Sequence, residues 1–183
     1  CHAGPEGDTA YAGYEDSLFE THVINTIDKH DPSTPLFLFW APHIVHSPLQ
    51  VPQEYIEKFD MVHATDKRCE IPACQRQLYH AMVNYADAMV GNVTAALKAK
   101  GMYDDLLIVF STDNGGPIYN NGSAGANNYP LRGGKYSDFE GGVRATAFIS
   151  GGLVPKPIRG SESNVTMHIA DWYATFAALA GLP

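Results

Sequence analysis

The spacing of apolar residues along the chain predicts three amphipathic helices. Apolar side chains recur every three or four positions over residues 15–30 and, for longer, over residues 75–100, where Gly101 follows as a helix stop. A last helix runs from Ile169 to Leu179 and ends before Gly181. Because each helix has one apolar face, each must pack against another layer of the protein.

Short apolar runs between these helices predict strands. Residues 36–40 and 106–110 are apolar without polar alternation, as in strands that are covered on both faces, and residues 145–149 predict a third short strand. Residues 115–143 form a long glycine-rich loop, and loops of that length in compact domains are usually functional or disordered. This alternation predicts an α/β domain with a mainly parallel sheet sandwiched by helices.

Composition narrows the classes of function. Hydrophobic residues make up 45% of the chain and charged residues 17%, which is a globular composition and excludes a disordered, collagen-like or coiled-coil chain. The formal net charge of −8 disfavours non-specific binding to nucleic acids or anionic membranes. The longest apolar runs fall far short of the roughly 20 residues that a membrane span needs.

The three cysteines do not form a zinc-ligand pattern. Cys69 and Cys74 are spaced for a local disulfide, which would leave Cys1 to pair with a partner outside the given chain. The first residue is Cys rather than Met, and no signal peptide follows it, so we expect the chain to be a fragment.

Three sequons favour the secretory pathway. They begin at Asn92, Asn121 and Asn164. We expect N-glycans at Asn92 and Asn164. Asn121 lies between Asp113 and Lys135, where a glycan would obstruct a cleft, and we expect it to stay unmodified.

Polar residues follow two of the predicted strands, where α/β sheets bind ligands. His43 and His46 follow the first of these strands, and Asp113 and Asn114 follow the second. Asp and Asn oxygens are hard ligands that suit calcium or magnesium better than zinc. The alternative is that Asp113-Asn114-Gly115-Gly116 is simply a turn, since turns favour these residue types.

Lys135 and His46 are candidates for charge stabilisation and proton transfer. At about 4 Å and an effective dielectric constant near 20, one lysine ammonium attracts an anion by roughly 4 kcal/mol. A histidine such as His46 can donate a proton to a leaving group near neutral pH. The alternatives are a solvated surface lysine and a structural histidine.

Four ordered motifs closely resemble those of type I sulfatases, in the alkaline-phosphatase-like superfamily. They are residues 40–52 (WAPHIVHSPLQVP), 110–116 (FSTDNGG), 129–135 (YPLRGGK) and 139–144 (FEGGVR). Residues 168–175 resemble a helix of the family, although Ala174 stands where a proline is common. Within the family, residues 45–52 and 91–98 are most similar to the arylsulfatase B (N-acetylgalactosamine-4-sulfatase) group.

The resemblance implies hydrolysis of sulfate esters, either aryl sulfates or sulfated glycosaminoglycans. Members of the family attack sulfur with a formylglycine hydrate made from a cysteine, while a calcium ion holds the sulfate. By motif, Asp113 and Asn114 match the later pair of calcium ligands, His46 matches the histidine that assists the leaving group, and Lys135 matches the lysine that binds the sulfate. Residues 1–183 are then expected to be part of a sulfatase catalytic domain in a lysosomal or extracellular glycoprotein.

The chain departs from the family pattern at the nucleophile. No cysteine lies in C-x-P-S-R or C-x-A-S-R, so the modified cysteine and the first two aspartate ligands are expected upstream of this sequence. One alternative is a non-catalytic sulfatase-like protein that binds sulfated glycans. Another is a phosphoesterase of the same superfamily with two transition metals, but such enzymes carry Asp-His at this strand end, and Asn114 favours a single hard cation. An unrelated α/β domain would require all four motifs to coincide by accident.

Overall fold

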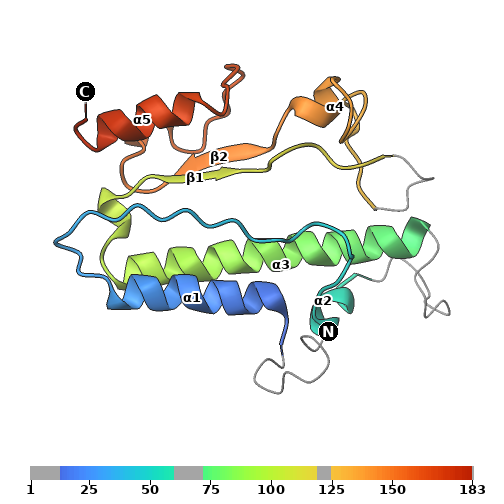
Figure 1. Ribbon diagram of the computed structural model, residues 1–183, viewed down its shortest axis with the longest axis horizontal. Helices are drawn as coiled ribbons and strands as arrows, with labels where there is room; N and C mark the ends of the chain where they lie inside the picture. Colours follow the sequence, from blue (N-terminus) through green and yellow to red (C-terminus); the bar gives the residue numbers. More distant parts are fainter. Residues whose placement is uncertain (1–12, 60–71, 119–124, 183) are drawn as a thin grey trace. The chain divides into compact units, whose positions relative to one another are not determined.

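The computed structural model describes residues 13–59, 72–118 and 125–182, excluding the side chains of residues 72–74. It divides into two compact units, residues 1–153 and 154–183. The elements in chain order (Figure 1) are α1 (Glu15–Lys29), α2 (Gln53–Ile56), α3 (Pro72–Ala99), η1 (Tyr103–Asp105), β1 (Ile108–Ser111), α4 (Glu140–Val143), β2 (Ala147–Ser150), η3 (Lys156–Ile158) and α5 (Asp171–Leu179).

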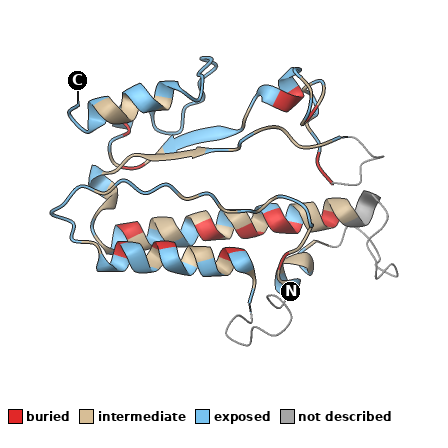
Figure 2. Ribbon diagram, viewed as in Figure 1, coloured by how far each residue is buried: buried red, intermediate tan, exposed pale blue. Residues whose placement is uncertain are grey.

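The packed pair of helices α1 and α3 holds the core of the first unit. The two helices lie side by side, and the buried positions in Figure 2 recur along α3. One core cluster contains Val23 and Ile27 of α1 and Leu97 of α3. The other is built on Ala81, Met82, Tyr85 and Met89 of α3, together with Val51. The structure confirms the helices predicted over residues 15–30 and 75–100, whose apolar stripes supply both clusters.

Three tyrosine rings meet at the larger core cluster. The ring of Tyr85, 6% exposed, contacts Tyr14 edge-on at 5.2 Å between centroids and Tyr55 at 4.9 Å. Burial, and then the nearby negative charge of Glu20, raise the pKa of Tyr85 to about 12. The folded protein therefore keeps the phenol protonated at pH values where an unfolded tyrosine ionises.

We expect this cluster to make the protein sensitive to alkali. The stabilisation from Tyr85 is complete below pH 10, the ordinary tyrosine pKa, and is lost as the pH rises from about 10 to about 12. In Tyr85→Phe the free energy of unfolding should therefore fall less steeply above pH 10 than in the wild type. Urea unfolding of the intact protein at pH 8 to 11.5 measures this, and parallel curves for the two proteins would contradict it.

Strands β1 and β2 form a two-stranded antiparallel sheet. Ile108 pairs with Ser150 and Phe110 with Phe148, whose rings stack at 4.8 Å. The predicted strands at 106–110 and 145–149 are both present, shifted by one to two residues toward the C-terminus. A parallel pair would need a long crossover connection, whereas α4, the helix that the structure describes between these strands, has only four residues.

The strand predicted over residues 36–40 is absent. This segment is extended, but the structure assigns it to no sheet. Its side chains alternate: Trp40 packs against both core clusters, whereas Phe37 and Phe39 are 74% and 83% exposed. The apolar run predicted burial on both faces, but among the described residues the core covers only one face.

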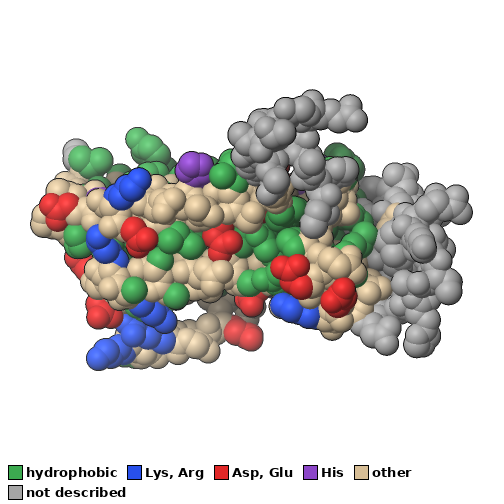
Figure 3. Space-filling model, turned by 90° about the horizontal axis from the view of Figure 1, so that it is seen from below, with side chains coloured by type: hydrophobic (Ala, Val, Ile, Leu, Met, Phe, Trp, Pro, Cys, Tyr) green, Lys and Arg blue, Asp and Glu red, His purple; other side chains and the backbone are tan. Residues whose placement is uncertain are grey.

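The second unit contains η3 and α5. The stacked rings of Trp172 and Phe176 lie 5.8 Å apart on α5, which begins two residues later than the sequence predicts. The Asp171 carboxylate accepts the backbone N–H of His168 at the start of this helix. Among the described residues, no helix is long and apolar enough to cross a membrane. On the face drawn in Figure 3, acidic and basic side chains both occur among apolar ones.

Candidate active site

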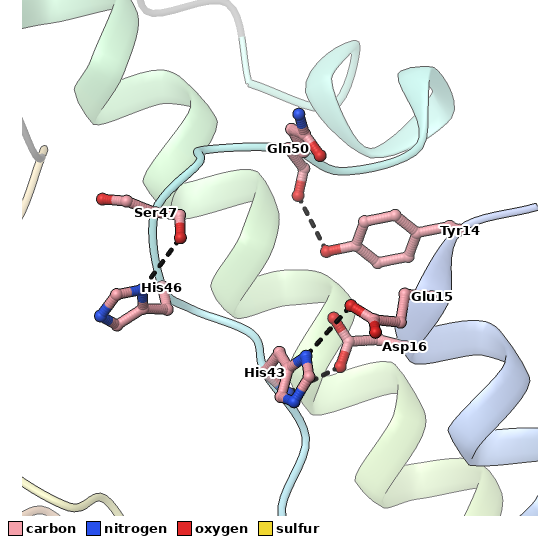
Figure 4. Close-up of polar contacts among 7 residues, drawn as sticks. All are labelled: Tyr14, Glu15, Asp16, His43, His46, Ser47 and Gln50. Atoms are coloured by element: carbon pink, nitrogen blue, oxygen red, sulfur yellow. Dashed lines mark hydrogen bonds and ion pairs between the residues drawn. The ribbon is translucent and has the colours of Figure 1, made fainter. Parts of the chain in front are cut away.

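His46 lies on the loop that leads from the extended segment to α2. The side chain is exposed, and its Nδ1–H donates to the carbonyl oxygen of Ser47 at 2.9 Å (Figure 4). This bond orients the ring, so that Nε2 remains available on the opposite side. The proline-punctuated sequence of residues 42–52 thus forms a loop that presents one imidazole nitrogen.

Lys135 lies in the glycine-rich loop and meets His46 across 89 positions of sequence. Its Nζ is 3.2 Å from Nε2 of His46. An ammonium group can only donate, so Nε2 accepts and the proton of the neutral imidazole lies on Nδ1, where it bonds to Ser47. The lysine ammonium and the candidate proton-transfer group, the His46 imidazole, therefore lie side by side. The sequence alone did not establish this contact.

Asp113 and Asn114 follow β1, which ends at Ser111, after one intervening residue, Thr112. One carboxylate oxygen of Asp113 accepts the backbone N–H of Asn114, and the Asn114 amide donates to the Gly115 carbonyl. The second Asp113 oxygen and the Asn114 amide oxygen are hard donors of the kind that calcium takes. Calcium needs six to eight oxygens, and among the described residues no three His, Cys, Asp or Glu side chains gather. The two residues can supply two of those oxygens.

Glycines let the loops around these residues touch. The N–H of Gly115 donates to the Gly142 carbonyl, and a Cβ on Gly115 would lie 1.7 Å from the carbonyl oxygen of Gly141. A Cβ on Gly134, beside Lys135, would lie 2.5 Å from the Gly116 carbonyl oxygen. The Asp-Asn-Gly-Gly segment bends at Asp113 and Asn114, and its glycines allow the close contacts with residues 134, 141 and 142.

Asn128 links the segment after β1 to the segment that leads into Lys135, although no sequence motif singled it out. Its amide oxygen accepts the N–H of Gly116, and its amide nitrogen donates to the carbonyls of Gly116 and Gly133. The Gly116 carbonyl also accepts the N–H of Lys135 at 3.1 Å. Only its place in a glycine-rich loop pointed to Asn128, and that feature does not separate it from neighbouring Asn127.

The other candidates lie away from His46 and Lys135 or outside the described residues. The His43 ring is turned toward Glu15 of α1, at 3.0 Å. Asn92 is exposed in the interior of α3, where its amide donates to Glu20 at 2.8 Å, and Asn164 is exposed in the second unit. The predictions for Cys1, Cys69 and Asn121, and for the side chain of Cys74, concern atoms outside the described part of the chain.

Comparison with known proteins identifies the family of this chain. Residues 3–182 match the sulfatase family. Arylsulfatase J of Mus musculus is 37% identical over 96% of this chain, and arylsulfatase A of Homo sapiens is 31% identical over 85% of it. The crystal structure of Ps i-CgsB in complex with k-i-k-neocarrahexaose superposes on 94% of the chain with a TM-score of 0.77 and 35% identity.

The chain belongs to the sulfatase family, and the alkaline-phosphatase-like α/β fold class predicted from the sequence is confirmed. It spans 28% of the mouse arylsulfatase J sequence, 27% of human arylsulfatase A and 35% of the solved structure.

Proposed function

We propose that this chain is the part of a sulfatase that binds the sulfate group and protonates the leaving group during hydrolysis of a sulfate ester. The observation that carries the proposal is the 3.2 Å contact between Lys135 Nζ and His46 Nε2. Lys135 is tied through its backbone to Gly116, two residues beyond Asn114. The two contacts together link residues from three of the sequence motifs, 40–52, 110–116 and 129–135.

Each residue has a role that follows from its chemistry. Lys135 binds a sulfate oxygen and stabilises the negative charge that develops on transfer. His46, once protonated, donates from Nε2 to the ester oxygen while the Ser47 carbonyl keeps hold of Nδ1. Asp113 and Asn114 would hold a calcium ion, and a formylglycine made from a cysteine elsewhere in the protein would supply the nucleophile.

The substrate we propose is a sulfated carbohydrate or an aryl sulfate. Among relatives, the names arylsulfatase J, arylsulfatase A and N-acetylgalactosamine-6-sulfatase support this class, as does the neocarrahexaose bound in the similar crystal structure. Motif similarity to the arylsulfatase B group favours a glycosaminoglycan sulfate. We further propose that residues 1–183 are part of one catalytic domain, in a lysosomal or secreted protein with glycans at Asn92 and Asn164.

The test is hydrolysis of paired esters by the full-length protein. We expect release of 4-nitrophenol from 4-nitrophenyl sulfate and far slower release from 4-nitrophenyl phosphate, together with a formylglycine-containing peptide by mass spectrometry. Preference for the phosphate would favour the phosphoesterase alternative. Binding of sulfated glycan without hydrolysis would favour a non-catalytic relative. The absence of both binding and hydrolysis would refute the proposal.

Calcium affinity tests the assignment of Asp113 separately from activity. Asp113→Ala removes a carboxylate donor, so we expect calcium to bind the full-length protein at least about tenfold more weakly, roughly 1.4 kcal/mol. Isothermal titration of metal-free protein with calcium measures this. Asp138→Ala removes an exposed carboxylate three residues after Lys135 and serves as the matched control. Equal affinity in the Asp113 and Asp138 variants would remove Asp113 from the site.

A further inference from the structure

The start of helix α1 holds both ends of the loop that carries His46. The Asp16 carboxylate accepts the backbone N–H of His43 at 2.9 Å, three residues before His46. The hydroxyl of Tyr14 donates to the carbonyl of Gln50 at 2.8 Å, four residues after it. Figure 4 shows these contacts on either side of His46, reaching the loop from one end of α1.

Asp16 is almost fully buried, although it is a charged residue in the first turn of a helix. It is 3% exposed, and burial of a carboxylate costs free energy unless hydrogen bonds compensate. The bond from the His43 N–H supplies such compensation. Burial, and then the neighbouring Asp16 charge, raise the pKa of Tyr14 well above its ordinary value, so Tyr14 keeps the proton that it donates to the loop even in alkaline solution.

The side chain of His43 adds a further link to α1. Its Nδ1 lies 3.0 Å from the Glu15 carboxylate, and its ring meets Phe19 edge-on at 5.4 Å. His43 is therefore turned toward α1, while His46, on the same loop, reaches Lys135. The two histidines have different partners, although the sequence presents them as a pair.

His46 depends on its loop for its position. Its side chain is exposed, and its hydrogen bonds are to the neighbouring Ser47 carbonyl and to Lys135. The Ser47 bond orients the ring relative to its own loop but does not fix that loop relative to Lys135. The bonds from Tyr14 and Asp16 fix the loop relative to the start of α1.

We propose that Asp16, assisted by Tyr14, is a positioning residue that fixes the 42–50 loop so that His46 Nε2 stays opposite Lys135 Nζ. The inference rests on the proposed function and extends it to a residue outside the motifs. Displacement of a catalytic group by about 1 Å can cost on the order of a hundredfold in rate. Asp16 thus influences the reaction through His46, without touching the substrate.

Leaving-group chemistry separates a positioning role from a general structural one. Proton donation by His46 matters most when the departing oxygen is basic and least when it is a stable phenolate. Loss of the Asp16 bond should therefore slow hydrolysis of phenyl sulfate, whose phenolate is a poor leaving group, more than hydrolysis of 4-nitrophenyl sulfate. A variant that only reduces the amount of folded enzyme slows both equally.

The experiment measures kcat for both esters in full-length Asp16→Ala and Asp16→Asn. We expect Asp16→Ala to lower kcat about 30-fold or more with phenyl sulfate and less than about fivefold with 4-nitrophenyl sulfate. Asp16→Asn keeps an oxygen that accepts the His43 N–H and should stay within about threefold of wild type with both. In the double variant Asp16→Ala/His46→Ala, the ratio of kcat with 4-nitrophenyl sulfate to kcat with phenyl sulfate should equal that of His46→Ala alone. The reason is that both changes remove proton donation by His46.

The matched control is Thr21→Ala, which removes an exposed hydroxyl one turn further along α1 and should leave the ratio unchanged. If Asp16→Ala does not fold, Tyr14→Phe removes the bond to Gln50 alone, and a smaller shift of the ratio in the same direction is expected.

Two results would overturn the proposal: an equal loss with both esters, or failure of Asp16→Asn to restore the ratio. If the wild-type protein hydrolyses neither ester, the proposed function fails. The positioning role is then decided by a crystal structure of Asp16→Ala, or of Tyr14→Phe if that variant alone folds. We expect separation of His46 from Lys135, and an unchanged contact would refute the role.

Discussion

Replacing Lys135 by alanine is expected to lower kcat for sulfate-ester hydrolysis by about a hundredfold or more. The reason is that one preorganised cation facing a developing negative charge contributes on this scale. The 3.2 Å contact with His46 puts the ammonium beside the group that we propose protonates the ester oxygen. Steady-state kinetics of the full-length protein with an aryl sulfate give the measurement.

Lys98→Ala is the matched control for this prediction. Lys98 is an exposed lysine in the last turn of α3, where its ammonium lies over the ring of Tyr103 rather than beside His46. We expect kcat within about twofold of wild type, as for surface substitutions in general. An unchanged kcat in Lys135→Ala would show that the lysine is a solvated surface group.

Gly115→Ala is expected to be the most damaging single substitution near the site. The added Cβ would lie 1.7 Å from the Gly141 carbonyl oxygen, which is backbone and not the flexible end of a side chain. The backbone at Gly115 or at Gly141 must therefore move, and the bond from Gly115 N–H to the Gly142 carbonyl must stretch or break. We expect a loss of about 3 kcal/mol or more of unfolding free energy, the upper range for overpacking.

Gly91→Ala provides the control with the same chemical change. Gly91 lies in α3 with nothing within 4 Å of its added Cβ, so alanine there should stabilise the helix by up to about 1 kcal/mol. Chemical unfolding of the full-length protein compares the two variants. Similar midpoints would mean that the loops adjust to the added carbon at little cost.

The helices were predictable because their signal is local. The stripe over residues 75–100 fixes which side of α3 is apolar, and the same side forms the core. The segment at residues 36–40 shows the limit of this reasoning. Its composition indicates burial, but burial depends on what covers each face, and that is decided by parts of the protein distant in sequence.

The motif residues of the site were predictable one by one, but their arrangement was not. Asp113 and Asn114 follow a strand as expected, because turn chemistry after an apolar run is a local pattern. The contact between His46 and Lys135 joins two loops, and no periodicity in the sequence encodes it. The roles of all four residues remain predictions for the experiments above.

Asn128 bears on the entropy of anion binding. Its amide bonds to Gly116 and Gly133, and the Gly116 carbonyl also accepts the N–H of Lys135, so the backbone that leads into Lys135 is held when the protein folds. Fixing the backbone of one free residue costs roughly 1–2 kcal/mol, and a mobile loop would incur that cost at several residues on each binding event. If Lys135 binds an anion as proposed, the ordering of this backbone is not a further entropic cost of binding, and the lysine side-chain torsions remain to be restricted.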